Sequence, residues 1–394
     1  MDRSASRRHF LAAGLTLPAV ASASRPQDSP AAKPRPQSSP ATSPVFQYRT
    51  LGKTGLKVTT VGMGCMITAD SSVVERAADL GITYFDTARI YQQGNNERMV
   101  GAALKRKRKD IVLSTKTPAK SKADALAHID TSLKELGTDY VDIWYLHGRS
   151  QSSEIIDELI EAQQIAKQAG KIRFAGVSTH SGQPELMPFL AKHEKIDVIL
   201  TSYNFTMEPV ITSVIEEAAK AGKGIVAMKV MAGGAGAGRG RGGPNPNAEK
   251  LKQPGAIAAA YRWVTRNPNV HTTIPSMTDM DQLADNIKAG VQTFGPAEEK
   301  LLAAYREDIR PIYCNMCGKC EGSCRFGLPV ADVLRFVTYA EGYGQFALGR
   351  ERFRELSAEH AEVRCGDCPG CTVACPHGVH VTDRLIRAQE LFAV

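Results

Sequence analysis

The sequence lacks three features that would point to common classes of protein. Its apolar run near the start, residues 11–21, is too short and too rich in small residues to read as a membrane span. The net charge is +8, but no basic stripe is interleaved with aromatic residues, which argues against nucleic-acid binding. No GxGxxG motif follows the first predicted strand, which argues against a doubly wound nucleotide-binding fold. What remains is a globular chain of 394 residues, long enough for a large and a small domain.

The first 45 residues are predicted to lie outside the folded part. Arg7 and Arg8 precede the apolar run, and small residues at 21–23 suit cleavage by a signal peptidase. Residues 1–24 therefore resemble a twin-arginine (Tat) export signal, which implies a periplasmic protein, anchored in the membrane only if the signal is retained. Residues 25–45 are rich in Pro, Ser and Ala and are predicted to be an extended linker.

Between residues 46 and 295, short apolar runs alternate with amphipathic stretches. A hairpin is predicted first, at 48–51 and 56–58. Eight further runs are predicted to be strands: Val61–Met63, Thr83–Phe85, Ile111–Ser114, Val141–Leu146, Phe174–Val177, Val198–Leu200, Ile225–Met228 and Thr272–Ile274. Helical patterns lie between them, for instance at 123–136, 155–169, 210–221, 256–265 and 280–289. The alternation predicts an α/β fold, a (β/α)8 TIM barrel rather than an open sheet.

Four polar residues stand where predicted strands end, and such a barrel carries its chemistry at that end. Asp86 ends the second strand with Tyr91 just beyond it, Lys116 ends the third and His147 the fourth. We expect Lys116 to lower the pKa of Tyr91 and Asp86 to hold the lysine. His147 would orient a carbonyl oxygen that Tyr91 protonates. Each residue alone has a simpler structural explanation, so the prediction depends on the four together.

These segments resemble the aldo-keto reductase superfamily. The matching stretches are LGKTGLKVTTVGMG (51–64), YFDTARIY (84–91), NERMVG (96–101), LSTK (113–116), YVDIWYLHG (140–148) and GVS (176–178). The resemblance implies hydride transfer between a nicotinamide, NADP(H), and a small carbonyl or alcohol substrate. It makes Asp86, Tyr91, Lys116 and His147 the catalytic residues, with Tyr91 as the proton donor. It also places Cys65 near the nicotinamide or the substrate, although a small buried thiol is the commoner role of a single cysteine.

The nucleotide-binding pattern of that family is only partly present. Leu200 and Met228 stand where its members usually place a glutamine and a stacking aromatic, and Ser276 and Gln282 where many carry basic residues. The candidates that remain for cofactor binding are Ser178, Lys229, Asn286 and, in the glycine-rich loop 233–243, Arg239 and Arg241. That loop could wrap a pyrophosphate or be a flexible surface loop, so the use of NADP(H) stays open.

Eight of the nine cysteines form two motifs of identical spacing, C-x2-C-x2-C-x3-C. They are Cys314, Cys317, Cys320 and Cys324, and Cys365, Cys368, Cys371 and Cys375. This is the bacterial ferredoxin pattern, so the sequence predicts two 4Fe–4S clusters, with Cys324 and Cys375 binding either their own cluster or the other one. Structural zinc is the alternative, but zinc sites usually use C-x-x-C pairs. Because the motif and the helix after it are repeated, residues 296–394 are predicted to form a ferredoxin-like, α+β or α-rich iron–sulfur domain.

The sequence therefore predicts an exported oxidoreductase, an enzyme that reduces a carbonyl or oxidises an alcohol in its barrel. The clusters would exchange electrons with a redox partner protein. Two alternatives stay open: an enzyme supplied by the clusters without a nicotinamide, and a non-catalytic electron carrier whose barrel is an idle scaffold. A hydride carries two electrons whereas each cluster usually carries one, so a direct transfer between them is chemically awkward.

Overall fold

The computed structural model describes residues 46–233 and 253–392. The predicted leader and linker lie outside the described residues, as does nearly all of the glycine-rich loop, with Arg239 and Arg241. Among the described residues, no helix has both the length and the apolar character needed to cross a membrane.

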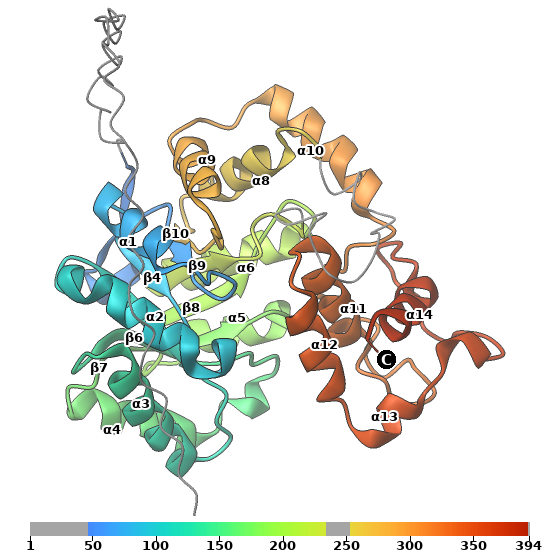
Figure 1. Cartoon of the computed structure of the whole chain (residues 1–394), viewed down its shortest axis with the longest axis horizontal. Helices are drawn as coiled ribbons and strands as arrows, with labels where there is room; N and C mark the ends of the chain where they lie inside the picture. The colour runs from blue at the N-terminus through green and yellow to red at the C-terminus, as the bar shows by residue number, and fades with distance from the viewer. Residues whose placement is uncertain (1–45, 234–252, 393–394) are drawn as a thin grey trace, which may run out of the picture. The chain divides into compact units, whose positions relative to one another are not determined.

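Eight parallel strands close into a barrel after a short antiparallel hairpin, β1 (Tyr48–Thr50) and β2 (Lys57–Thr59) (Figure 1). The eight are β3 (Met63–Gly64), β4 (Tyr84–Asp86), β5 (Val112–Thr117), β6 (Val141–Leu146), β7 (Ile172–Thr179), β8 (Val198–Ser202), β9 (Gly224–Met228) and β10 (Thr272–Thr273). They pair in chain order. Bridges from Val61 to Thr273 and from Gly64 to Ser276 join the first strand to the last. The predicted barrel is therefore present.

Helices cover the outside of the barrel, and their ends follow local capping signals. They are α1 (Ser71–Leu80), α2 (Asn95–Leu104), α3 (Lys122–Leu136), α4 (Asp157–Gln168), α5 (Gln183–Lys192), α6 (Pro209–Lys220), α8 (Ala256–Thr265), α9 (Met280–Gly290) and α10 (Pro296–Ile309). Asp70, Ser121 and Asp279 cap the starts of α1, α3 and α9 by accepting backbone N–H bonds. Gly81 and Gly137 end α1 and α3 in the left-handed conformation.

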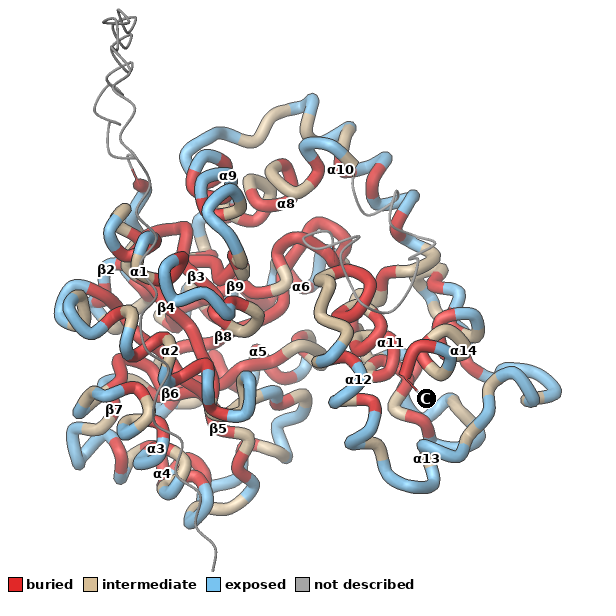
Figure 2. The backbone as a smooth tube through the Cα atoms, in the orientation of Figure 1, coloured by how far each residue is buried: buried red, intermediate tan, exposed pale blue. Residues whose placement is uncertain are grey.

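Apolar side chains fill the inside of the barrel at the amino-terminal end and in the middle. In Figure 2 the strands of the barrel are coloured mostly as buried. Every residue of β5 and β6 is buried, as is usual for parallel strands covered on both faces. Inward residues alternate along each strand, so Tyr84 and Tyr145 lie one layer below Asp86 and His147, and their hydroxyls are 2.7 Å apart. Leu51, in the hairpin loop, closes the bottom of the barrel. At the carboxyl end of the barrel, by contrast, the side chains that point inward are polar.

The C-terminal region consists of helices and turns. Its helices are α11 (Val330–Val337), the π-helix η6 (Thr338–Gly342), α12 (Phe346–Arg354), α13 (Ala358–Glu362) and α14 (Val381–Phe392). A short 3-10 turn, η7 (Cys365–Asp367), also lies in this region, and another, η2 (Tyr91–Gly94), lies in the barrel. Residues 296–392, all of them described, contain no β-strand, so of the two predicted forms of this region only the α-rich one agrees with the structure. Its helices share an apolar cluster of their own.

Helix α10 packs on the barrel, although the sequence analysis assigned it to the second domain. Leu302, Tyr305 and Ile309 of α10 share an apolar cluster with Ala256 and Ala260 of α8. The predicted boundary at residue 295 therefore separates two helices that are packed together.

Candidate active site and cysteine clusters

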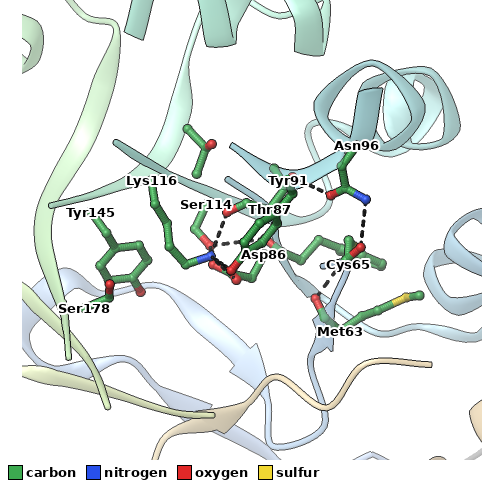
Figure 3. Close-up of polar contacts among 12 residues, drawn as sticks. Met63, Cys65, Asp86, Thr87, Tyr91, Asn96, Ser114, Lys116, Tyr145 and Ser178 are labelled. Atoms are coloured by element: carbon green, nitrogen blue, oxygen red, sulfur yellow. Dashed lines mark hydrogen bonds and ion pairs between the residues drawn. The ribbon is translucent and has the colours of Figure 1, made fainter. Parts of the chain in front are cut away.

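Lys116 is the centre of a buried polar network at the carboxyl ends of β4 and β5 (Figure 3). Its Nζ forms an ion pair with Asp86, and it donates hydrogen bonds to the Thr87 carbonyl oxygen at 2.7 Å and the Tyr91 hydroxyl at 3.2 Å. The second carboxylate oxygen of Asp86 accepts a hydrogen bond from Ser114 at 2.7 Å. The side chains of Lys116 and Asp86 are only 1% and 2% exposed. The ammonium is therefore fixed beside the phenol with little access to water.

Tyr91 is brought over the barrel mouth by an unusual turn, η2. Gln92 and Gln93, directly after it, have φ angles of 48° and 55°, in the left-handed region that few side chains adopt. The start of α2 is tied to the first strand, since the buried Asn96 donates to the Cys65 carbonyl oxygen at 2.7 Å. Such strain persists only where surrounding contacts impose it, and it often accompanies a functional site.

The network keeps Tyr91 protonated and Lys116 charged near neutral pH. Burial raises the pKa of Tyr91, and the opposing effect of Lys116 only partly offsets it. Lys116 thus acts on the pKa of Tyr91 in the predicted direction, but burial is the larger effect and sets the net shift. Burial acts to lower the pKa of Lys116, but Asp86 and Tyr91 outweigh it and the pKa is raised.

His147 stands beside Tyr91 at the end of β6. The two rings meet edge to face, with centroids 5.9 Å apart and planes at 82°. Burial, followed by the charges of Lys116 and Arg352, holds the pKa of His147 well below its usual range, so the imidazole is neutral. Its buried Nδ1 has no hydrogen-bond partner among the described residues. A neutral imidazole has one N–H donor, which is available for a ligand.

A cavity of about 80 Å³ opens beside this network. Asp86 and Tyr91 line it from one side, while Met228 and Lys229 at the end of β9 and His180 after β7 also line it. The structure thus brings the four predicted catalytic residues to one end of the barrel, with Asp86 and Tyr91 directly on the cavity. A buried acid, base and hydrogen-bond donor at a cavity are the parts needed for proton transfer to a bound oxygen.

Residues 68–305 match the model of the aldo/keto reductase family. The chain belongs to that family. This aldo/keto reductase is 36% identical over 173 residues to the uncharacterized oxidoreductase YqkF of Bacillus subtilis, a match that covers 40% of the chain and 56% of the relative. It is 28% identical over 296 residues to L-galactose dehydrogenase of Arabidopsis thaliana, covering 65% of the chain and 92% of that protein.

Solved structures show the same likeness. The holo form of an aldo-keto reductase from Bacillus halodurans superimposes with a TM-score of 0.57 and 27% identity, covering 70% of this chain and 99% of that one. The predictions of a TIM-like barrel, an aldo/keto reductase and an oxidoreductase enzyme are thereby confirmed. The matched segment ends before the first cysteine motif.

The candidates for nucleotide binding in this aldo/keto reductase differ in whether they are buried or line the cavity. The hydroxyl of Ser178 accepts a hydrogen bond from the Gly148 backbone at 2.8 Å and is buried. Asn286 is buried in α9, whereas Lys229 lines the cavity. Two further candidates lie outside the described residues: Arg239 and Arg241. Of the described candidates, Lys229 is therefore the one that the cavity lining includes.

The positions expected to hold a nicotinamide are apolar. Leu200 is buried among the apolar side chains inside the barrel, and Met228 lines the cavity. Neither offers the amide or the aromatic face that the family is expected to use there, so the described residues fit a nicotinamide poorly at these two points. Cys65 is fully buried, and burial raises the pKa of its thiol, which favours the structural role.

The eight cysteines of the C-terminal region fall into two sets in space, and all are free thiols. Burial, with a smaller contribution from the neighbouring Cys320, Cys317 and Cys375, raises the pKa of Cys314 to about 12. The first three cysteines of motif one therefore lie near the last cysteine of motif two.

The second set likewise combines three cysteines of one motif with the fourth cysteine of the other motif. A small cavity is lined by Cys365, Cys368 and Cys371 of motif two together with Cys324 of motif one. Among the described residues, no three His, Cys, Asp or Glu side chains are grouped as the ligands of one metal ion. The thiolates of a cubane cluster bind four different iron atoms and so need not converge on one point. Two exchanged sets of four cysteines fit the arrangement of two-cluster ferredoxins.

The first cysteine set is fixed to the carboxyl end of the barrel. Asn204, after β8, donates to the Tyr313 hydroxyl at 3.3 Å, next to Cys314. Asn315 donates to the carbonyl oxygen of Thr206 at 3.1 Å. These hydrogen bonds hold the cysteine loop at the same end of the barrel as Tyr91.

Sequence analysis missed three residues at the mouth of the barrel. His180 directly follows β7, so the rule that strand ends carry the chemistry could have identified it. Tyr343 lines the cavity from the C-terminal region, and Tyr339 packs beside it. No local sequence signal places these two tyrosines at the barrel, because the contact depends on how distant segments pack.

Proposed function

We propose that this aldo/keto reductase interconverts a small carbonyl compound and its alcohol, with Tyr91 as the proton donor. The observation that carries the proposal is the Tyr91 hydroxyl, held 3.2 Å from the buried Lys116 ammonium at the edge of a cavity. In the direction of reduction, a hydride adds to the carbonyl carbon and the carbonyl oxygen takes the proton of Tyr91. Lys116 stabilises the phenolate that is left, and Asp86 balances the lysine.

His147 contributes a second hydrogen bond to the reacting oxygen. Its neutral imidazole can donate one N–H without carrying a charge that would compete with Lys116. Donors aimed at an oxygen that gains negative charge stabilise the transition state more than the substrate. When bound, NADP(H) supplies or accepts the hydride.

The two cysteine sets are proposed to hold two 4Fe–4S clusters, which supply one-electron transfer to a redox partner protein. One set is Cys314, Cys317, Cys320 and Cys375, and the other is Cys365, Cys368, Cys371 and Cys324. The spacing of the motifs, the free thiols and the exchange of the fourth cysteine support the assignment. The paired arginines of the leader support export by the Tat route to the periplasm.

A second candidate function uses the clusters as the electron source without a nicotinamide. The observations that favour it are the apolar Leu200 and Met228 and the presence of Tyr343, a residue of the C-terminal region, in the lining of the cavity. A fluorescence titration with NADPH separates the two candidates. Quenching or enhancement that saturates supports the first, and an unchanged signal supports the second.

The substitution Tyr91→Phe tests both candidate functions against the alternative that the barrel is a scaffold without catalytic activity. With small aldehydes and either NADPH or dithionite as the electron source, turnover should fall by about 10²–10⁴-fold when the proton donor is lost. Tyr140→Phe is the matched control, because it removes the same hydroxyl from the residue directly before β6, at the opposite end of the barrel. Equal turnover by Tyr91→Phe and the wild type would refute the proposed chemistry.

A further inference from the structure

The π-helix η6 lies directly against the loop that follows β9. A β-carbon added to Gly342 would lie 2.5 Å from the Gly233 carbonyl oxygen, and one added to Gly233 would lie 3.1 Å from the Tyr313 ring. Gly233 also has a φ of +82°, which favours glycine. The two backbones therefore meet without intervening side chains. Single turns of π-helix inside a helix often mark functional sites.

This contact places two tyrosines around the ammonium of Lys229. Its Nζ lies 4.8 Å from the centroid of the Tyr339 ring and 5.0 Å from that of Tyr343. Lys229 has a φ of 58°, so its backbone is held in a conformation that a lysine seldom adopts. The ring faces attract the cation but accept none of its three N–H bonds in the manner of an oxygen.

Lys229 also lacks an acidic partner within the described part of the chain. Its ammonium forms no hydrogen bond or ion pair with another described residue, whereas the ammonium of Lys116, near the end of β5, forms an ion pair with Asp86. Two carboxylates of the C-terminal region are already paired with arginines. Asp332 pairs with Arg335 at 2.8 Å, and Glu355 pairs with Arg352 at 2.7 Å.

Arg335, the partner of Asp332, is a second cation close enough to act on Lys229. It precedes Tyr339 by four residues on the helix that continues from α11 into η6, so both side chains project to the same side. Its Nε is buried and has no hydrogen-bond partner among the described residues. Burial, followed by the charges of Arg335 and Lys229, lowers the pKa of His180, which lines the cavity, well below its usual range.

We propose that Lys229, backed by Arg335 of the C-terminal region, forms an anion subsite in the cavity, and that the substrate is a carbonyl compound carrying a carboxylate. A single ammonium whose N–H donors are taken up by no described residue suits one singly charged group. The carboxylate would be the acidic partner that the described residues do not supply to Lys229, while the carbonyl lies at Tyr91, which lines the same cavity. The inference rests on the proposed carbonyl chemistry and gives that chemistry its substrate class.

The test measures binding of two probes to the full cluster-loaded chain by calorimetry, with no electron donor present. Succinic semialdehyde is a four-carbon aldehyde ending in a carboxylate, and butanal is a neutral aldehyde of the same length. The carboxylate should improve affinity by about tenfold or more, the usual effect of one hydrogen bond to a charged group. Lys229→Gln should remove that advantage and leave butanal binding unchanged.

Two further variants make the result specific. Lys134→Gln removes the same charge from an exposed residue near the end of α3, at the opposite end of the barrel, and should change neither affinity. Arg335→Gln leaves the barrel sequence intact. It should weaken the binding of succinic semialdehyde by several-fold, which is less than the effect of Lys229→Gln, because Arg335 lies farther from the bound carboxylate than Lys229 does. If Lys229→Gln does not fold, Arg335→Gln still tests the subsite.

Three outcomes would overturn the subsite: equal affinity for the two aldehydes, an equal loss of both in Lys229→Gln, or, in a separate fluorescence titration of Lys229→Gln with NADPH, a loss of NADPH affinity alone. The last would make Lys229 a ligand of nucleotide phosphate instead. Because binding is measured without turnover, the two proposals fail separately. Selective binding without reduction would reject only the proposed function, and reduction without selectivity would reject only the subsite.

Discussion

Replacing Lys116 by methionine should destabilise the fold as well as abolish activity. The methionine preserves most of the apolar stem but removes the ion pair to Asp86 and the hydrogen bonds to Thr87 and Tyr91. The Asp86 side chain, 2% exposed, is then a buried carboxylate whose remaining side-chain donor is Ser114. Breaking a buried pair by removing one partner costs about 3–5 kcal/mol, so the free energy of unfolding should fall by that amount.

A double-mutant cycle shows whether the cost comes from the stranded charge. Asp86→Asn combined with Lys116→Met removes both charges and should cost only about 1–2 kcal/mol, because replacing both partners of a buried pair is often close to neutral. Urea unfolding followed by circular dichroism measures all three variants. Lys122→Met is the control: it breaks the exposed pair with Glu161 and should cost about 0–1 kcal/mol. A double variant as unstable as Lys116→Met would refute the argument.

Three further predictions concern the cysteine sets, the buried histidine and the π-helix. Cys324→Ser, in motif one, should remove the cluster bound by the motif-two cysteines. Iron and sulfide analysis should then find about half of the roughly eight iron atoms of the wild type. Loss of the cluster bound by the motif-one cysteines instead would disprove the exchange of the fourth cysteine. Because the pKa of His147 lies well below 6.5, the unfolded chain takes up a proton there as pH falls below 6.5 and the folded chain does not. Stability should therefore decrease by up to about 1.4 kcal/mol per pH unit from this group, and urea midpoints should show a shallower pH dependence in His147→Leu; identical slopes would contradict this. Gly342→Ala forces a β-carbon to within 2.5 Å of the Gly233 oxygen and should cost about 1–3 kcal/mol in thermal or urea unfolding, whereas an unchanged midpoint would show that the two backbones do not meet.

Much of the barrel and its catalytic residues could be predicted because they follow a two-residue period. Asp86 and His147 each lie two residues beyond a buried tyrosine on the same strand, so both face inward at the carboxyl end. Parallel pairing then brings the strand ends together, which is how Lys116 reaches Asp86. The predicted catalytic group therefore needed only the strand positions and their order.

Burial and long-range packing could not be predicted in the same way. The net pKa shift of Tyr91 depends on how much water reaches it, which a strand pattern does not reveal. Tyr343 reaches the cavity from more than a hundred residues beyond the end of β9, through a contact between Gly233 and Gly342 that no motif signals. The apolar surroundings of Leu200 became clear only from the packing inside the barrel.

The central claim is that Tyr91 and His147 both donate hydrogen bonds to the carbonyl oxygen of a bound substrate. Infrared difference spectroscopy of a carbonyl-labelled aldehyde bound to the full chain, with no electron donor, measures this directly through the C=O stretching frequency. We predict a lower frequency than in water, and a partial return toward higher frequency in both Tyr91→Phe and His147→Leu. A frequency equal to that of the free aldehyde in water, unchanged by either substitution, would contradict the account.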